Sequence, residues 1–170
     1  MPIQSSALQT PSTDTASPAN LVGKVDNMDV FDATEGPAPG EKTGLLELGD
    51  AFNVVLGWDL TGVDTTIVGG YWLVSLYSSA MDGQGQMTGL LSSSPPIPIV
   101  GAPSPLPFSY TFNVVPGSAG PPPVAQSAGL YKLTATINHS PTGNANDVSE
   151  MFGFAESSPI QITQVVDDSD

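Results

Sequence analysis

The chain contains no cysteine among its 170 residues. Disulfide bonds need paired thiols, and thiolate zinc sites, iron–sulfur clusters and cysteine nucleophiles all need a thiolate. The sequence therefore excludes these four features.

Positive charge is nearly absent as well. Seventeen acidic residues stand against three lysines and no arginine, which gives a formal net charge of −14. A nucleic-acid backbone or an anionic lipid surface would repel such a chain, and arginine, the usual reader of phosphate and guanine, is missing. We therefore expect no nucleic-acid partner. The acidity is typical of a protein kept in solution by its charge; a basic partner or bound cations are the functional alternatives.

Long apolar runs and a targeting segment are also lacking. No run reaches the roughly 20 residues that cross a bilayer. Residues 1–10 have neither the basic region nor the apolar core of a secretory signal peptide. We expect no membrane insertion, and cytoplasmic synthesis without a Sec signal peptide. Release would then occur as part of an assembled particle or by a signal-independent route.

What the chain does have is alternation of apolar and polar residues. In the segment 129–137, Tyr131, Leu133, Ala135 and Ile137 are apolar, and the even-numbered residues between them are polar. This period of two predicts a strand with one buried face. Further strands are predicted at residues 52–60, 108–114 and 159–166, with a weaker one at 86–91. Residues 71–77 are apolar on both faces, which predicts a central strand. Eighteen glycines and seventeen prolines provide turns between them, and no amphipathic helix is evident.

These patterns predict an all-β fold, an antiparallel β-sandwich of about seven strands at residues 45–166. Residues 1–44 are predicted to form an extended, flexible N-terminal arm that is partly docked. Residues 1–20 are polar and lack an apolar face, whereas 21–32 carry enough apolar residues to form an edge strand or to pack along the domain as an arm. Residues 167–170 are an acidic tail.

The order of three strands resembles the immunoglobulin-like sandwich. In that family a tryptophan on strand C packs centrally and a tyrosine on strand F forms a corner; Trp72 and Tyr131 match these positions, after a strand that contains Trp58. Leu56 and Leu133 stand where antibody domains have paired cysteines, so the resemblance is to a disulfide-free sandwich. It implies that Trp58, Trp72 and Tyr131 belong to the structural core, and it implies a fold, not a function.

Three segments also resemble uncharacterised sandwich proteins of bacterial gene clusters. They are Tyr-Trp-Leu-Val-Ser at 71–75, Tyr-Lys-Leu-Thr-Ala-Thr-Ile at 131–137 and Phe-Gly-Phe-Ala-Glu at 152–156. This resemblance identifies no functional family and implies no activity.

The candidates for metal binding are loop carboxylates. Asp82, Asp147 and Glu150 lie between predicted strands, where flexible loops would let them share a calcium ion. The spacing of an EF-hand is absent, and solvated loop acids are the other interpretation. We expect no cofactor, with calcium as the alternative.

Catalytic motifs are not found. His139, the single histidine, falls in a turn-like segment, and the hydrolase pattern Gly-x-Ser-x-Gly is missing. We predict that His139 is a surface turn residue and that the chain is not an enzyme. A small hydrolase built on Glu47, Glu150 or Glu156 is the remaining catalytic alternative.

The connection from Ser140 to Ser158 is the best candidate for recognition, because it is longer than a hairpin needs. It carries Met151, Phe152 and Phe154. These side chains either fill the core or form an exposed apolar patch for a partner.

The sequence thus predicts a non-enzymatic binding or structural module that acts through a protein partner or self-association, such as an accessory subunit of a larger bacterial or phage particle. A carbohydrate-binding or adhesin-like module is the alternative. It would need some of the aromatic side chains Tyr71, Trp72, Tyr77 and Tyr110 to point outward.

Overall fold

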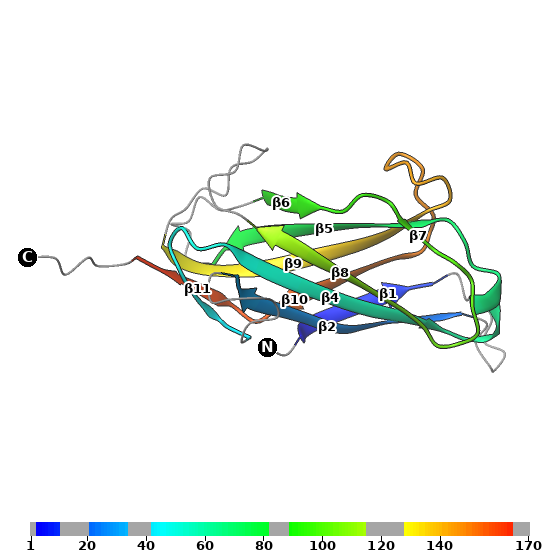
Figure 1. Cartoon of the computed structure of the whole chain (residues 1–170), viewed down its shortest axis with the longest axis horizontal. Helices are drawn as coiled ribbons and strands as arrows, with labels where there is room; N and C mark the ends of the chain where they lie inside the picture. Colours follow the sequence, from blue (N-terminus) through cyan, green and yellow to red (C-terminus); the bar gives the residue numbers. More distant parts are fainter. Residues whose placement is uncertain (1–2, 11–20, 34–41, 82–88, 115–127, 165–170) are drawn as a thin grey trace, which may run out of the picture.

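Two packed β-sheets make up the part of the chain that the computed structural model describes, which is residues 3–10, 21–33, 42–81, 89–114 and 128–164 (Figure 1). In chain order the elements are β1 (Ile3–Gln9), β2 (Val22–Asp32), β3 (Leu45–Glu47), β4 (Phe52–Thr61), the 3-10 helix η1 (Val63–Thr66), β5 (Tyr71–Ala80), β6 (Gly89–Ser93), β7 (Ile97–Pro98), β8 (Leu106–Val114), β9 (Gly129–Ser140), β10 (Phe152–Ser157) and β11 (Ile160–Thr163). The all-β sandwich prediction is confirmed, with eleven strands among the described residues.

The two sheets have unequal sizes. Sheet B is β2-β4-β8, and the other eight strands form sheet A. In sheet A, β5 pairs with β9 along their whole length, and β6 and β7 pair with the other edge of β5. On the far side of β9, β10 and β11 follow one another; β1 pairs with β10, and β3 pairs in parallel with β11.

The strand order is that of an immunoglobulin-type sandwich. In that arrangement strands B and E pair in one sheet and strands C, F and G pair in the other. Here β4 and β8 pair in sheet B, while β5, β9 and β10 are consecutive in sheet A. Leu56 on β4 and Leu133 on β9 are fully buried at the positions where antibody domains carry cysteines. Packing therefore takes the place of the disulfide.

An aromatic cluster lies in the core between the sheets. Trp58 and Trp72 are fully buried, with their ring centroids 5.9 Å apart at right angles. Phe108 packs against both, at 5.7 Å from Trp58 and 5.6 Å from Trp72. Tyr131 is also fully buried. Edge-to-face and stacked rings at these distances add to the stabilisation from burial.

Of the two interpretations of residues 21–32, the structure has the edge strand. Strand β2 lies within the predicted arm of residues 1–44, yet it pairs with β4 over nearly its whole length. A register shift between Val25 and Asn27 interrupts the alternation of buried and exposed residues in β2. Val25 is buried before the shift and Met28 after it, so the period of two that marks a strand in the sequence is broken there. Most of the arm outside β1 and β2, and the acidic tail 167–170, lie outside the described residues.

Residues 42–43, just before β3, bond to β2. Lys42 forms an isolated bridge with Phe31 on β2, and the Thr43 N–H donates to the Val30 carbonyl at 2.9 Å. The chain then enters sheet A as β3. Within the described residues the helical content is one four-residue turn, so no helix there could span a bilayer.

Candidate functional site

The segment predicted as a loop from Ser140 to Ser158 contains a strand. Strand β9 runs to Ser140 and β10 begins at Phe152, so the connection is residues 141–151. The loop prediction was wrong because β10 lacks the usual strand pattern of large apolar residues facing the core and polar residues facing outward. Its large side chains Phe152 and Phe154 face outward, while the small residues at 153, 155 and 157 face the core.

The three predicted partner-binding residues have different environments. Met151 is 4% exposed and belongs to the core. Phe152 is 46% exposed, and Phe154 beside it is half-buried. Met151 therefore fills the core, and the two phenylalanines form part of an outward surface.

That surface is the outer face of sheet A. Phe152 lies opposite Asn138 of β9, and Phe154 lies opposite Thr136. On the next strand, Tyr77 of β5 lies opposite Thr134 and is 39% exposed. The face thus combines aromatic rings with hydroxyl and amide groups on paired strands.

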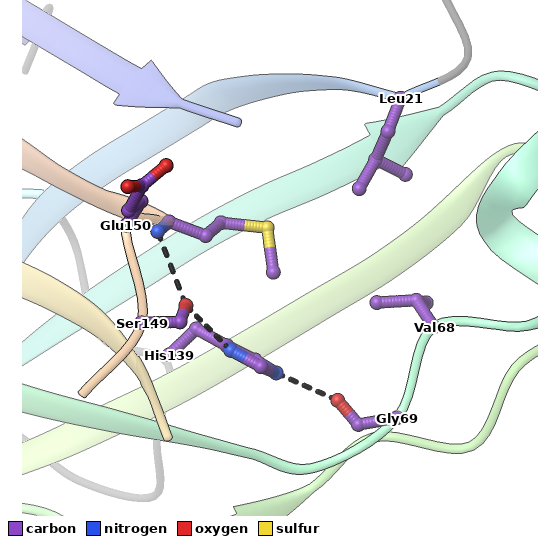
Figure 2. Close-up of a pocket in the computed structure, with 7 residues that line it drawn as sticks. Leu21, Val68, Gly69, His139, Ser149 and Glu150 are labelled. Carbon is purple, nitrogen blue, oxygen red and sulfur yellow. Dashed lines mark hydrogen bonds between the residues drawn. The ribbon is translucent and has the colours of Figure 1, made fainter. Parts of the chain in front are cut away.

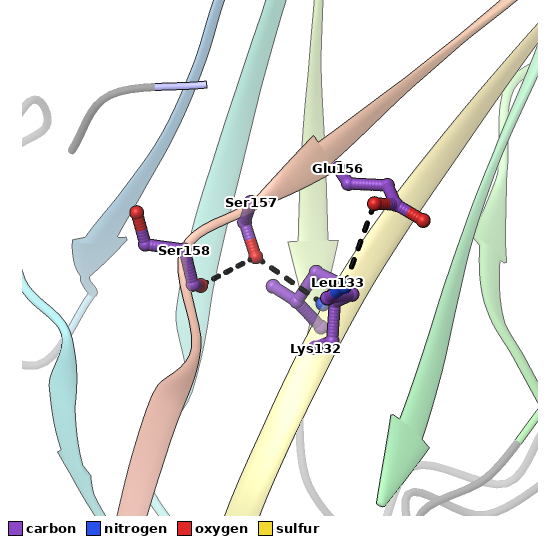
Figure 3. A network of polar contacts seen from close by, with 5 residues as sticks. All are labelled: Lys132, Leu133, Glu156, Ser157 and Ser158. Atoms are coloured by element: carbon purple, nitrogen blue, oxygen red, sulfur yellow. Dashed lines mark hydrogen bonds and ion pairs between the residues drawn. The ribbon is translucent and has the colours of Figure 1, made fainter. Parts of the chain in front are cut away.

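Two charged groups of this face form an ion pair. Lys132 of β9 and Glu156 of β10 form an ion pair with 3.5 Å between Nζ and Oε2 (Figure 3). Both side chains are about one-third exposed, at 34% and 31%. An exposed pair of this kind contributes little stability. It balances the charges that β9 and β10 contribute to this face, which also carries Glu47 of β3.

A serine supports the bend between β10 and β11. The Leu133 N–H of β9 donates to Ser157 Oγ at 3.2 Å, and the Ser157 hydroxyl donates to the Ser158 carbonyl at 2.8 Å (Figure 3). Pro159 follows and has no N–H for the ladder. The side chain of Ser157 therefore replaces a backbone rung, and it fixes the end of the strand that carries both phenylalanines.

The connection 141–151 is held by local hydrogen bonds. Ser140 Oγ accepts from the Gly143 N–H at 2.9 Å and donates to the Asn144 carbonyl at 3.0 Å. Thr142 Oγ1 donates to Asp147 at 2.9 Å.

The calcium candidates are not brought together in the described part of the chain. Asp147 and Glu150 are both exposed, and Asp82 lies outside the described residues. No group of three metal-ligating side chains occurs among the residues that the structure describes.

His139 sits in a pocket rather than in a surface turn. Its Nε2 lies 2.7 Å from the Gly69 carbonyl and its Nδ1 lies 2.8 Å from Ser149 Oγ (Figure 2). Its ring packs edge-on against Trp72, with 5.7 Å between the ring centroids. The pocket has a volume of about 360 Å³; its lining residues are Leu21, Val68, Gly69, His139, Ser149, Glu150 and Met151. The turn prediction was wrong because β9 continues through His139. The Gly69 carbonyl that the ring bonds is 70 residues away in the sequence.

The partners of the His139 ring show which atom donates in each of its hydrogen bonds. A carbonyl only accepts, so Nε2 carries the proton that bonds Gly69. In the neutral ring, Nδ1 then accepts from the Ser149 hydroxyl, whose oxygen also accepts from the Met151 N–H at 3.1 Å. This network ties the connection 141–151 to the start of β5. A serine beside a histidine resembles a nucleophile and its base, but a neutral carbonyl stands where such sites place a carboxylate.

The aromatic residues named for carbohydrate binding divide between core and surface. Trp72 is fully buried, and Tyr110 packs against Phe112 at 4.9 Å on the inner face of β8. Tyr71 and Tyr77 lie on the outer face of sheet A. Of these four residues, Tyr71 and Tyr77 are therefore the ones on an outer face.

Sheet B carries a pair of carboxyl groups on its outer face. Burial raises the pKa of Asp59, and the charge of Asp26 and a hydrogen bond between the two carboxyls raise it further; Lys24 acts in the opposite direction. The two groups lie on neighbouring strands, because Lys24 and Asp59 are cross-strand partners.

No family model matches the chain, and no curated protein matches it in sequence. Solved structures do match its fold. The C-terminal domain of wzt has a TM-score of 0.56 at 12% identity, over 87% of this chain and 77% of that one. A β-glucosidase from Listeria innocua in complex with glucose has a TM-score of 0.43 at 11% identity, and this chain spans 16% of its length. The CARDB domain of the PF1109 protein from Pyrococcus furiosus, in complex with di-metal ions, has a TM-score of 0.39 at 14% identity. The likeness to the C-terminal domain of wzt supports a β-sandwich fold and no specific activity.

Proposed function

We propose that the chain is a non-enzymatic binding module that acts in protein–protein assembly through the outer face of sheet A. One observation carries the proposal. Phe152 keeps 46% of its surface exposed although β10 lies between two strands, β9 and β1, and not at a sheet edge. A ring held outward by a paired strand is already ordered, so little conformational entropy is lost when a partner covers it.

The chemistry of the face indicates the kind of partner. Phe152, Phe154 and Tyr77 offer apolar contact, and the threonines and asparagine of β9 offer hydrogen bonds. A protein surface with an apolar centre fits this arrangement. The net charge of −14 would steer a partner whose rim is basic and would speed its association at low salt. An accessory subunit of a larger bacterial or phage particle is the setting we propose.

The His139 network supports a role without catalysis. Ser149 Oγ is already engaged by the His139 ring and by the Met151 N–H, and a carbonyl rather than a carboxylate holds the other ring nitrogen. Neither ring nitrogen bonds the carboxylate that orients the histidine in hydrolases. The network is better suited to holding the loop than to attacking a substrate.

Site-specific crosslinking tests the proposal. A photoreactive phenylalanine analogue replaces Phe152 in one sample and exposed Gln161 of β11, in the same sheet, in the other. In extract of the source cells we expect one dominant adduct at position 152 and none at 161. Excess wild-type chain should abolish that adduct, whereas excess Phe152→Ser/Phe154→Ser chain should not. Equal adducts at both positions, or equal competition by both chains, would contradict the proposal.

A carbohydrate ligand is the second candidate, and the exposure of Tyr77 favours it. Flat aromatic rings beside serine and threonine hydroxyls match the apolar faces and hydroxyl groups of sugars. A glycan array with the wild-type chain and Tyr77→Ala separates the candidates, with Tyr110→Phe as the control on the inner face of β8. Binding that falls with Tyr77→Ala but not with Tyr110→Phe would favour a sugar. An array without signal would leave a protein partner as the remaining candidate.

A further inference from the structure

One side of the sandwich is built from a nearly uncharged stretch of sequence. Between Asp64 and Lys132 the chain has one charged residue, Asp82. This stretch supplies β5, β6, β7 and β8, and β6 contacts β8 across the two sheets (Figure 1). These four strands therefore carry no formal charge in a protein of net charge −14.

Strand β8 is the edge of sheet B on this side. Its nine residues pair with β4 from Leu106 to Val114, and no described residue pairs with its other edge. Natural sheets protect such an edge with lysine, with bulges or with very short strands. Strand β8 has none of these, and its one proline, Pro107, lies next to its first residue. The opposite edge of sheet B differs, because the Lys42 bridge partly covers β2.

We infer that β8 pairs antiparallel with β8 of a second copy of this chain, about a two-fold axis, so that two sheets of three strands become one sheet of six. The inference is independent of the outer face of sheet A. The contact surface is the open edge of β8, and a second copy of the chain occupies it.

The distribution of charge favours a second copy over other partners. A basic partner would be attracted to the acidic surfaces and would gain nothing from an uncharged edge. Two copies repel one another through their net charge, and this repulsion is smallest when the uncharged sides meet. A two-fold axis also makes the edge self-complementary.

The side chains of β8 suit this pairing. Ser109, Thr111 and Asn113 are exposed on the outer face, and hydroxyl side chains pair well across antiparallel strands. Phe108 and Tyr110 are half-buried on the inner face, with the edge beside them open among the described residues. A neighbouring strand would cover these two rings. With the axis at Tyr110, Ser109 of one copy faces Thr111 of the other.

Salt provides the first test, on the unaltered chain. Sedimentation equilibrium over a range of protein concentrations measures the dimer dissociation constant at low and at high sodium chloride. Because the contact is uncharged while the copies repel at a distance, salt should lower the dissociation constant. A dimer weakened by salt, or a monomer at every concentration and salt level, would overturn the inference.

Substitution locates the contact. Ser109→Asp/Thr111→Asp places like charges opposite each other across the axis, and we expect the dissociation constant to rise about tenfold or more. Ser79→Asp/Gln161→Asp adds the same charge to exposed positions of sheet A and should leave a dimer. Thermal melts check that both variants fold. The contact would lie elsewhere if the two double variants weakened the dimer equally, or if Phe152→Ser/Phe154→Ser weakened it and Ser109→Asp/Thr111→Asp did not.

Cysteine chemistry reads the pairing directly, because the chain has no cysteine of its own. Ser109→Cys and Thr111→Cys chains are oxidised separately and as a mixture. We expect the mixed 109–111 disulfide to form faster than either symmetric one. If none forms faster than with a Gln161→Cys control, the strands do not pair.

Discussion

Ser157 is a fully buried hydroxyl whose two hydrogen bonds are both to backbone groups. Ser157→Ala would leave the buried Leu133 N–H without its acceptor. We expect a loss of about 1–3 kcal/mol in the free energy of unfolding, the usual cost of an unsatisfied buried donor. Urea denaturation measures it, with exposed Ser79→Ala as the control, expected to stay within about 0.5 kcal/mol. An equal effect of the two substitutions would show that the rung is dispensable.

Asp59 gives a pH dependence of known sign. Its pKa is raised above 3.8 in the folded state, chiefly by burial, so the folded chain holds this proton more tightly than the unfolded chain. Its stabilising contribution is therefore complete below the unfolded pKa and is lost as pH rises through the folded pKa. Asp59→Asn should stabilise the protein at pH 7, by up to about 0.5 kcal/mol because solvent screens the group.

Urea denaturation at pH 4 and pH 7 checks this expectation. The gain from Asp59→Asn should be larger at pH 7 than at pH 4. A gain that is the same at both values, or a loss confined to pH 7, would contradict the assignment. Asp32→Asn, on the same strand as Asp26, serves as the comparison.

The turn before β5 depends on one glycine. Gly70 has a φ of +86°, a region that favours glycine, and a Cβ there would lie 2.7 Å from the Ser140 carbonyl oxygen. Gly69 has open space around it. Gly70→Ala should therefore cost more than about 1 kcal/mol, whereas Gly69→Ala should be neutral or slightly stabilising. Thermal melts of the two variants compare them, and equal midpoints would contradict the argument.

The strands that could be predicted from sequence are those with apolar residues inside and polar residues outside. Strands β4, β8 and β9 follow this pattern, and β5 was recognised as apolar on both faces; the predicted positions of all four are confirmed. Strand β10 was missed because its rings face outward and its small residues face inward. Strand β2 was assigned to the arm because a register shift interrupts its alternation.

The candidate site was predictable in its residues but not in its geometry. Phe152 and Phe154 were identified by their type, yet their place on a strand depends on pairing with β9 and β1. The position of His139 depends on contacts with Trp72 and Gly69, which come from distant parts of the chain. Local sequence carries no signal for such contacts, so the pocket could not be foreseen.

At the scale of the whole molecule, acidity should limit stability. The described residues contain three ion pairs against a net charge of −14, so repulsion dominates at low ionic strength. Raising sodium chloride from about 0.01 M to 0.15 M shortens the screening length from about 30 Å to 8 Å. We expect the melting midpoint to rise over this range. A midpoint that falls would mean that ion pairs outweigh the repulsion.

Calcium requires a separate comparison, because any cation screens the charge. At equal ionic strength we expect calcium and magnesium to raise the melting midpoint equally. A larger, concentration-dependent effect of calcium that is lost in Asp147→Asn would instead show a site that includes this loop.

The parallel pairing of β3 with β11 has a mechanical consequence. The Gln161 N–H donates to the Gly44 carbonyl and the Leu48 N–H to the Thr163 carbonyl, both at 2.8 Å, so the pair is bonded at both ends. Tension that enters before Leu45 and leaves after Thr163 pulls the two strands lengthwise past each other. The bonds are then loaded in shear and must break together, rather than one at a time as in an unzipping hairpin. Within an assembly under load, this short pair would act as a clamp.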